Sequence, residues 1–363
     1  MEIVQTAITI VLFFLILGTL VVIHEVGHFV TARLAGVRVL EFGIGFPPRA
    51  RVIKSDGETL YTLNWLPIGG FVKLEGEDGD DTDDPRSFVN ARLPVKLVIL
   101  VSGVFMNLLL AFAIFLGIAL VGEPTLGIRA TAIQAGSPAA EVGLQPGDTI
   151  VTVNGQSFNL LDGESPLISL QAFAGQQVML GVERPEGGIR TFAVTLRPAS
   201  QINEDQGALG IEGPRHVTTN TPERYPVGAA IGVAGRRTTE AFGLILDGLR
   251  QLGEAMISRP TEAPPAAGPV GIAIGIGNTF WQLGLIPTLY LAGLLSANLA
   301  IVNILPFPPL DGGRMLILTL KTVVGQRISV RAERLTYAIG FIFLLTFLVW
   351  ITGFDIVRQL SGQ

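Results

Sequence analysis

The chain has 363 residues, of which 49% are hydrophobic and 15% charged, and its mean hydropathy is +0.53. This composition is too apolar for an ordinary soluble protein, and the net charge of −5 argues against a nucleic-acid partner, because no domain-wide basic surface is available to neutralise phosphates. The absence of cysteine excludes disulfides and thiolate metal sites, so any transition metal would be held by His, Asp or Glu.

The first apolar segment, residues 3–23, carries no charged side chain and is long enough for a helix to cross a hydrocarbon core of about 30 Å. Three later segments are similarly apolar. We therefore expect a multi-pass α-helical membrane protein in a lipid bilayer, with four transmembrane helices at about residues 3–30, 97–121, 283–320 and 335–354. A cleaved signal peptide is the alternative for the first segment, but a basic start is missing and the apolar run exceeds a signal core.

The first span ends in the sequence VVIHEVGHFVTARLAG, which contains His24, Glu25 and His28. On a helix the two histidines lie on one face, one turn apart, so two neutral imidazoles can bind one metal ion. Glu25 lies beside the first of them, where it can accept a proton from water. This HExxH pattern is typical of zinc proteases. The alternative is a group of polar side chains at a helix end, but ionisable groups in a spanning segment are costly and usually have a function.

The loop after the first span predicts a β-hairpin at about residues 59–75. Tyr61–Leu66 and Phe71–Leu74 have the composition of strands, and a Pro-Ile-Gly-Gly turn joins them. An exposed edge of this hairpin can pair with an extended peptide. The alternative is a simple cytoplasmic hairpin. The acidic run EGEDGDDTDD that follows is interpreted as a solvated flexible loop.

Basic residues are concentrated in the first and third loops. By the positive-inside tendency both loops are cytoplasmic, which places both termini and the segment between the second and third spans outside the cytoplasm. The basic residues in question are Arg33, Arg38, Arg49, Arg51, Lys54, Lys73, Arg86, Arg92 and Lys96 in the first loop, and Arg314, Lys321, Arg327, Arg331 and Arg334 in the third.

Residues 125–198 have the composition of a water-soluble domain. Ser137-Pro138 predicts a helix start and Gly143 its end, and the sequence GLQPGDTIVTVNG predicts a tight turn, a strand and a following hairpin. This sequence resembles the core of PDZ domains, in the variety found on bacterial envelope proteases. The resemblance implies one inserted extracytoplasmic PDZ-like α+β domain.

Residues 199–282 are expected to connect this domain to the membrane. The first part looks irregular, and we interpret His216 within it as a surface residue. Apolar residues at helical spacing then predict an amphipathic helix at about residues 238–257, which lies either on the outer membrane interface or against the PDZ-like domain. The stretch RPTEAPPAAGPVG is interpreted as a bend or linker into the third span.

The third span contains the sequence NLAIVNILPFPPLDGGRM, in which prolines at 306–309 interrupt the helix just before Asp311. Nonhelical backbone at membrane depth is tolerated only where it lines a cavity or is buried in protein, so the break marks a site. In the predicted topology Asp311 and the histidine pair both lie at cytoplasmic ends of their spans. The sequence therefore offers Asp311 as a third metal ligand.

HEVGH near the N-terminus, a PDZ-like domain between the second and third spans and the proline-broken LDGG segment together resemble the site-2 protease family, and specifically its bacterial PDZ-containing branch. These are zinc intramembrane proteases of regulated intramembrane proteolysis. The resemblance implies one Zn²⁺ per chain bound by His24, His28 and Asp311, with Glu25 as the catalytic base. Some branches of the family carry two PDZ domains, whereas this chain has room for one.

The resemblance also implies the partners and the location of the protein. The substrates would be single-span membrane proteins, such as membrane-bound anti-sigma factors or signal-peptide remnants, and the protein would lie in the inner (plasma) membrane with its zinc site toward the cytoplasm. A membrane-associated β-hairpin would bind unwound substrate. The candidate residues for binding substrate or stabilising the oxyanion are Gly69, Gly70 and Phe71 of the hairpin and Asn303, Asn298 and Asn107 of the spans.

Among the asparagines the resemblance favours Asn303, which directly precedes the broken segment. The alternative for Asn107 and Asn298 is a hydrogen bond between helices.

Two other functions of the protein stay open. A transporter usually shows repeated halves, and the sequence contains no internal repeat. A catalytically inactive scaffold that presents a PDZ module would have no need of Glu25.

Overall fold

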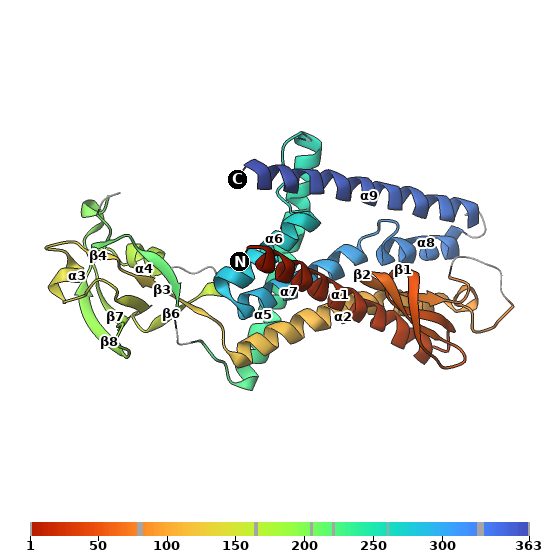
Figure 1. The fold of residues 1–363 in the computed structure, drawn as a ribbon, viewed down its shortest axis with the longest axis horizontal. Helices are drawn as coiled ribbons and strands as arrows, with labels where there is room; N and C mark the ends of the chain where they lie inside the picture. Colours follow the sequence, from red (N-terminus) through yellow and green to blue (C-terminus); the bar gives the residue numbers. More distant parts are fainter. Residues whose placement is uncertain are drawn as a thin grey trace. The chain divides into compact units, whose positions relative to one another are not determined.

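The computed structural model describes residues 2–77, 83–162, 166–203, 206–219, 222–259, 261–324 and 330–361. The chain divides into two compact units (Figure 1). The helical unit comprises Met1–Phe115, Val233–Gly284 and Thr288–Gln363, and the β-rich unit comprises Leu116–Gly232 and Leu285–Pro287. Part of the predicted acidic loop, residues 78–82, lies outside the described residues.

Four helices in the described part of the chain are long and apolar enough to cross a membrane, which confirms the predicted number. They are α1 (Glu2–Leu34), α2 (Leu93–Val121), α7 (Leu285–Ile304) and α9 (Val330–Ser361). At 1.5 Å per residue, even the 20-residue α7 spans about 30 Å. Because α1 continues to Leu34, the HExxH sequence lies inside a regular helix, which fixes the spacing of its side chains.

Two helices precede α7. The predicted amphipathic segment lies within the longer α5 (Val227–Ser258). The predicted linker, Arg259–Gly271, lies mostly between the end of α5 and the start of α6 (Pro269–Leu283), so it leads into α6 and not directly into the third span. The N-terminus of α6 is capped by a residue of α9: the N–H groups of Gly268 and Gly271 donate to the Asp355 carboxylate at 3.1 and 2.8 Å. A cap supplied from a distant helix leaves no local sequence signal.

The first loop forms a small sheet of two long strands, β1 (Val39–Ser55) and β2 (Leu60–Leu74). The predicted hairpin is wrong in its pairing, since Tyr61–Leu66 and Phe71–Leu74 belong to the one strand β2 and both pair with β1. Residue Phe42 of β1 has Val72 on one side and Tyr61 on the other. The first half of β1 thus lies between the two halves of β2, and the second half of β1 pairs with Leu60–Asn64. The sequence does not predict this arrangement, because β1 has no clear strand pattern of its own.

Aromatic packing and a tight turn attach this sheet to α1. The ring of Phe29 on α1 lies 5.2 Å from that of Phe42 and 6.0 Å from that of Tyr61. In the β1–β2 turn, the N–H groups of Thr59 and Glu58 donate to Asp56, which lowers the pKa of this carboxyl group to about 2. Arg33 at the end of α1 donates to the same carboxylate at 3.0 Å. The sheet is therefore held beside the helix that carries HExxH.

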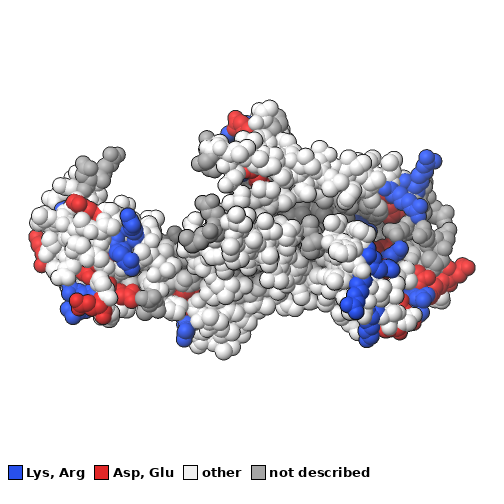
Figure 2. Space-filling view, viewed as in Figure 1, with Lys and Arg blue, Asp and Glu red and all other residues white. Residues whose placement is uncertain are grey.

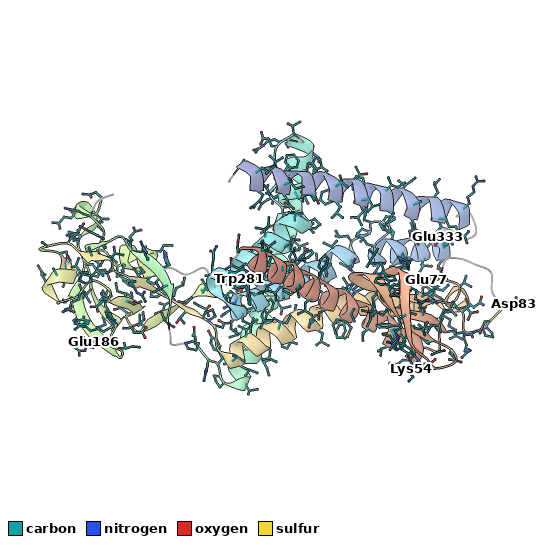
Figure 3. All side chains as sticks on the ribbon, viewed as in Figure 1. Lys54, Glu77, Asp83, Glu186, Trp281 and Glu333 are labelled. Atoms are coloured by element: carbon teal, nitrogen blue, oxygen red, sulfur yellow. The ribbon has the colours of Figure 1, made fainter. Side chains whose placement is uncertain are left out.

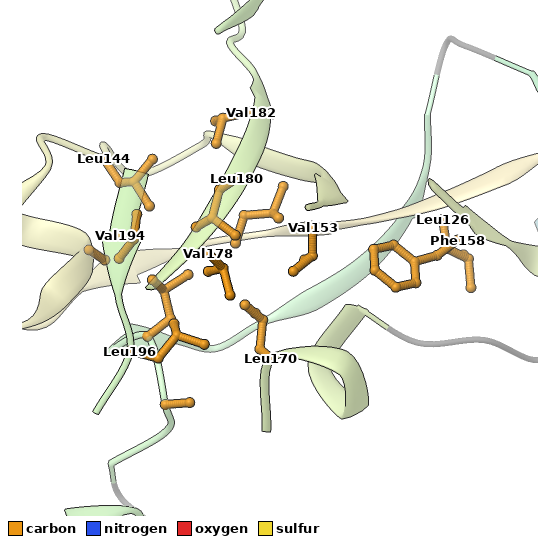
Figure 4. Close-up of a cluster of buried hydrophobic side chains, with 14 residues drawn as sticks. Leu126, Leu144, Val153, Phe158, Leu170, Val178, Leu180, Val182, Val194 and Leu196 are labelled. Carbon is orange, nitrogen blue, oxygen red and sulfur yellow. The ribbon is translucent and has the colours of Figure 1, made fainter. Parts of the chain in front are cut away.

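The β-rich unit contains a six-stranded sheet in the order β10-β3-β6-β5-β7-β8. Its buried side chains, among them Leu126, Val153, Leu170, Leu180 and Val194, form one hydrophobic core (Figure 4). The strands and helices of the unit are β3 (Thr125–Arg129), β4 (Ala132–Ile133), α3 (Pro138–Glu141), β5 (Thr149–Val153), β6 (Gln156–Asn159), α4 (Pro166–Ala172), β7 (Gln177–Glu183), β8 (Ile189–Thr195), β9 (Ile211–Glu212) and β10 (Arg215–Thr218).

Local features of this unit agree with the sequence prediction, but its C-terminal boundary differs from the predicted one. Ser137 caps α3 through the N–H of Ala140 at 3.2 Å, and Asn154 has a positive φ of 53° in the turn that joins β5 to β6. We expected the domain to end at residue 198 and an irregular connector to follow. Instead, β10 pairs with β3 and continues the sheet to Thr218. His216 lies on β10 with its side chain exposed, as expected.

Candidate metal centre

Two ligand atoms of the candidate site come from successive turns of α1. The Nε2 atoms of His24 and His28 lie 3.1 Å apart, and the two side chains are buried. Their rings meet edge to face with centroids 4.7 Å apart. The i, i+4 spacing alone brings both nitrogens to one point.

The third ligand atom comes from the start of α8 (Asp311–Val324). Oδ2 of Asp311 lies 3.0 Å from Nε2 of His24 and 3.3 Å from Nε2 of His28. Three ligand atoms that surround a tetrahedral zinc ion at about 2.0–2.2 Å lie about 3.3–3.6 Å from one another. The triangle needs to open by only a few tenths of an ångström, so this group can hold a metal ion.

The broken third span brings Asp311 to this position. α7 ends at Ile304, a proline-rich turn follows, and α8 begins at Asp311. A Cβ atom at Gly312 would lie 2.1 Å from the carbonyl oxygen of Ile304, and one at Gly313 would lie 2.5 Å from the carbonyl carbon of Phe307. The two glycines of LDGG therefore let the first turn of α8 fold back against the turn that precedes it.

Two residues on one face of α2, Ile99 and Gly103, lie against the two histidines. The sequence does not indicate this contact. Nδ1–H of His28 donates to the carbonyl oxygen of Ile99 at 2.8 Å, which leaves the Nε2 lone pair available to a metal. One turn later, a Cβ atom at Gly103 would lie 2.5 Å from Nε2 of His28 and 2.7 Å from Cε1 of His24. Gly103 therefore leaves open the space beside the two ligand nitrogens that an ion would require.

A cavity of about 520 Å³ opens onto the three ligands. Glu25 also lines it and is half-buried, so a carboxylate lies within the same chamber as the candidate metal ligands. One wall is the second half of β2: a Cβ atom at Gly70 would lie 3.6 Å from Cγ of Glu25. The cavity therefore brings together three side chains that could hold a metal ion, the carboxyl group of Glu25 and one half of a strand.

Comparison with known proteins agrees with this chemistry. A family model described as peptidase family M50 matches residues 12–347, a range that includes every residue of the candidate site. The chain belongs to peptidase family M50. This is the site-2 protease family, so the chain is a membrane protease.

Relatives of this M50 protease match over nearly its whole length. A protein of Clostridium acetobutylicum named "Putative zinc metalloprotease" is 34% identical, and the match covers 97% of this chain and 98% of that protein. Zinc metalloprotease RasP of Shouchella clausii is 26% identical over 97% of this chain and 100% of its own length. "Probable membrane metalloprotease ARASP2, chloroplastic" of Arabidopsis thaliana is 30% identical over 86% of this chain and 71% of its own.

Of the other candidate residues, the M50 chain brings Gly70 and Phe71 to the cavity wall. Gly69 is buried and is not among the described residues that line the cavity, and a Cβ atom there would lie 3.0 Å from the Phe46 ring. Asn298 and Asn303 on α7 are half-buried and do not line the cavity in the described part of the chain. The structure places Asn107 behind His24 with no exposed surface, so substrate cannot reach it in this arrangement.

Ion pairs of the M50 chain hold α8 in place, and one of them, between Arg314 and Glu77, lies on the cavity wall. Arg314, one turn after Asp311, forms an ion pair with Glu77, and its guanidinium carbon lies 5.8 Å from the ring centre of Tyr337 on α9. Lys321 and Glu333 form another pair between α8 and α9; Figure 3 labels both glutamates of these pairs. The ion pair of Arg314 thus joins α8 to the segment that follows β2.

Proposed function

We propose that this chain is a zinc-dependent intramembrane endopeptidase that cleaves transmembrane segments of single-span membrane proteins in regulated intramembrane proteolysis. The observation that carries the proposal is the meeting of His24, His28 and Asp311 beside Glu25, within and next to helices apolar enough to cross a membrane. The zinc metalloprotease names of the relatives support the choice of metal.

The donor set suits zinc. Two imidazole nitrogens and one carboxylate oxygen are its usual ligands in catalytic sites, where a fourth position stays open. When bound, zinc would acidify a water molecule and polarise the carbonyl of the scissile peptide bond. The space beside Gly103 and the orientation of His28 by Ile99 both fit such an ion.

In this proposal Glu25 accepts the proton of the attacking water and returns it to the nitrogen of the leaving peptide. Asn303 is the candidate donor to the oxyanion, because it lies in the last turn of α7 and its side chain has no hydrogen-bond partner among the described residues. Its amide would have to turn toward a bound substrate, since it does not line the cavity.

A peptide bond inside a helix is shielded, so the substrate must unwind locally, and its freed backbone groups then need new partners. Residues 70–74 of β2 can supply them. This half of β2 pairs with β1 on one side, from Ile44 opposite Gly70 to Val39 opposite Leu74, and it forms a wall of the cavity. The opposite edge would pair with extended substrate.

For the topology, we propose that the metal site faces the cytoplasm of an inner (plasma) membrane and that the β-rich unit is an extracytoplasmic PDZ-like domain. Lys and Arg, together with Asp and Glu, gather over the end of the helical unit that holds β1, β2 and α8 (Figure 2), whereas the middle of each of the four apolar helices α1, α2, α7 and α9 carries no charged residue. The positive-inside tendency makes that end cytoplasmic.

Zinc content tests the proposed ligands. Purified wild-type protein is expected to contain close to one zinc per chain, and His28→Ala and Asp311→Ala each remove a ligand and are expected to lose most of it. His216→Ala, which changes an exposed histidine of the β-rich unit, is the control and should keep the metal. Elemental analysis of the four preparations gives the answer. Full zinc in both ligand variants would rule out this ligand set.

A further inference from the structure

The two candidate metal-binding histidines differ in how their outer nitrogens are held. α2 lies beside α1, and its residues Ile99, Gly103 and Asn107 are spaced four apart and so share one face (Figure 1). The carbonyl of Ile99 accepts the hydrogen bond of His28. At the other end of this face, the side-chain amide of Asn107 lies against His24, with Nδ2 3.4 Å from Nδ1.

The side-chain amide of Asn107 is buried and has few possible hydrogen-bond partners. Its side chain has no exposed surface, and its Oδ1 has no hydrogen-bond partner among the described residues. A buried carbonyl without a partner is costly, and asparagine differs from any apolar residue of its size only in what its amide can donate or accept. We therefore expect the amide of Asn107 to form a functional hydrogen bond with His24.

The orientation with Nδ2 toward His24 suits the metal-free ring. Nδ1 then accepts from the amide, and the ring proton on Nε2 can donate to Oδ2 of Asp311, which lies 3.0 Å away. A metal requires the opposite tautomer, because Nε2 must offer its lone pair and the proton must be on Nδ1. That Nδ1–H needs an acceptor, and the other end of the Asn107 amide is the group within reach.

We propose that Asn107 is a positioning residue for the metal, whose Oδ1 accepts a hydrogen bond from Nδ1–H of His24 when the site is loaded. This inference rests on the proposed metal site. Loading turns the amide by half a turn about its last side-chain bond, while His24 loses its proton at Nε2 and gains one at Nδ1, with no net change. Both histidines then have an oxygen acceptor from α2 behind them.

The backbone at this level is fixed independently of the amide. The hydroxyl of Ser296 on α7 donates to the backbone carbonyl of Asn107 at 2.8 Å. Ser296→Ala therefore removes a contact that packs α2 against α7 but leaves the amide in place. It is the control that separates helix packing from an effect on His24.

The test is the zinc dissociation constant of the full chain in detergent, measured by competition with a chromogenic chelator. Asn107→Leu removes the acceptor at similar size, and loss of such an outer partner typically weakens metal binding about 10–100-fold. Asn107→Asp keeps an acceptor and is expected to bind zinc as tightly as the wild type or more tightly. Ser296→Ala should also bind like the wild type.

Equal zinc affinity in the wild type and Asn107→Leu would overturn the proposal, and so would equal weakening in the Leu and Asp variants, which would indicate packing alone. A wild type that binds no zinc would instead overturn the proposed metal site. If Asn107→Leu does not fold, ¹⁵N spectra of histidine-labelled, zinc-loaded wild type decide the matter. We expect a protonated, hydrogen-bonded Nδ1 in His24, and an unprotonated Nδ1 would contradict the proposal.

Discussion

Glu25→Gln is expected to lower the rate of substrate cleavage by about 10⁴-fold, the upper end of what general acid–base groups contribute, because one carboxylate acts on both the attacking water and the leaving nitrogen. Glutamine keeps the size of the side chain but cannot accept the proton. Glu25 is outside the three-atom metal group, so zinc should stay bound. Binding of uncleaved substrate should change little.

Zinc content, substrate co-purification and cleavage are measured on the same Glu25→Gln preparation. Glu254→Gln, which changes an exposed glutamate of α5, serves as the matched control and should cleave like the wild type. Undiminished cleavage by Glu25→Gln with zinc bound would show that another group is the base. A wild type that binds substrates without cutting them would favour the scaffold function.

Gly103→Ala is expected to reduce zinc affinity by about 100-fold or more, the upper end of effects known for residues that support metal ligands, because here the ligands themselves are displaced. The new methyl group would lie 2.5 Å from Nε2 of His28 and 2.7 Å from Cε1 of both histidines. Contacts that short force the imidazoles or α2 to move. Cleavage should fall with the loss of metal.

Gly117→Ala on the same helix is the matched control, because a Cβ atom there meets nothing within 4 Å. Both substitutions replace a helical glycine by alanine, which by helix propensity stabilises a helix by about 1 kcal/mol. Helix propensity therefore does not distinguish the two variants, and a difference between their zinc dissociation constants reports the contacts of the new methyl group with the histidines. If Gly103→Ala binds zinc as tightly as the wild type, the space beside Gly103 is not needed for metal binding.

The sequence was sufficient to predict the three residues that meet. His24 and His28 follow from local geometry, since residues four apart on a helix share a face. Asp311 required two further steps: recognising that prolines at 306–309 break an apolar helix, and assigning loop charges that put both segments at the same end of their spans. The structure brings these atoms within 3.3 Å of one another.

The contribution of α2 could not be predicted in this way. Gly103 and Asn107 lie in an ordinary apolar span, and small or amide residues there usually pack helices together. Their relation to the histidines depends on which faces of α1 and α2 meet, and pattern alone does not determine this. The sequence offers Asn107 as a substrate contact, whereas in the structure its side chain is fully buried next to His24.

The other differences have similar causes. The Pro-Ile-Gly-Gly segment of β2 predicts a turn, because such residues usually make turns, yet β1 pairs with residues on both sides of that segment. The sequence does not predict β10, because Arg215–Thr218 is a short strand whose partner, β3, is distant in sequence. In each case a long-range partner determined the local structure.

The most direct test of intramembrane proteolysis is to map the bond that purified enzyme cuts in a single-span membrane protein. Mass spectrometry of the products is expected to place the cut within the apolar transmembrane segment. A chelator should abolish the cleavage and added zinc should restore it. Cleavage found only outside the transmembrane segment would contradict the proposed function. Undiminished cleavage by enzyme from which a chelator has removed the zinc would contradict it as well.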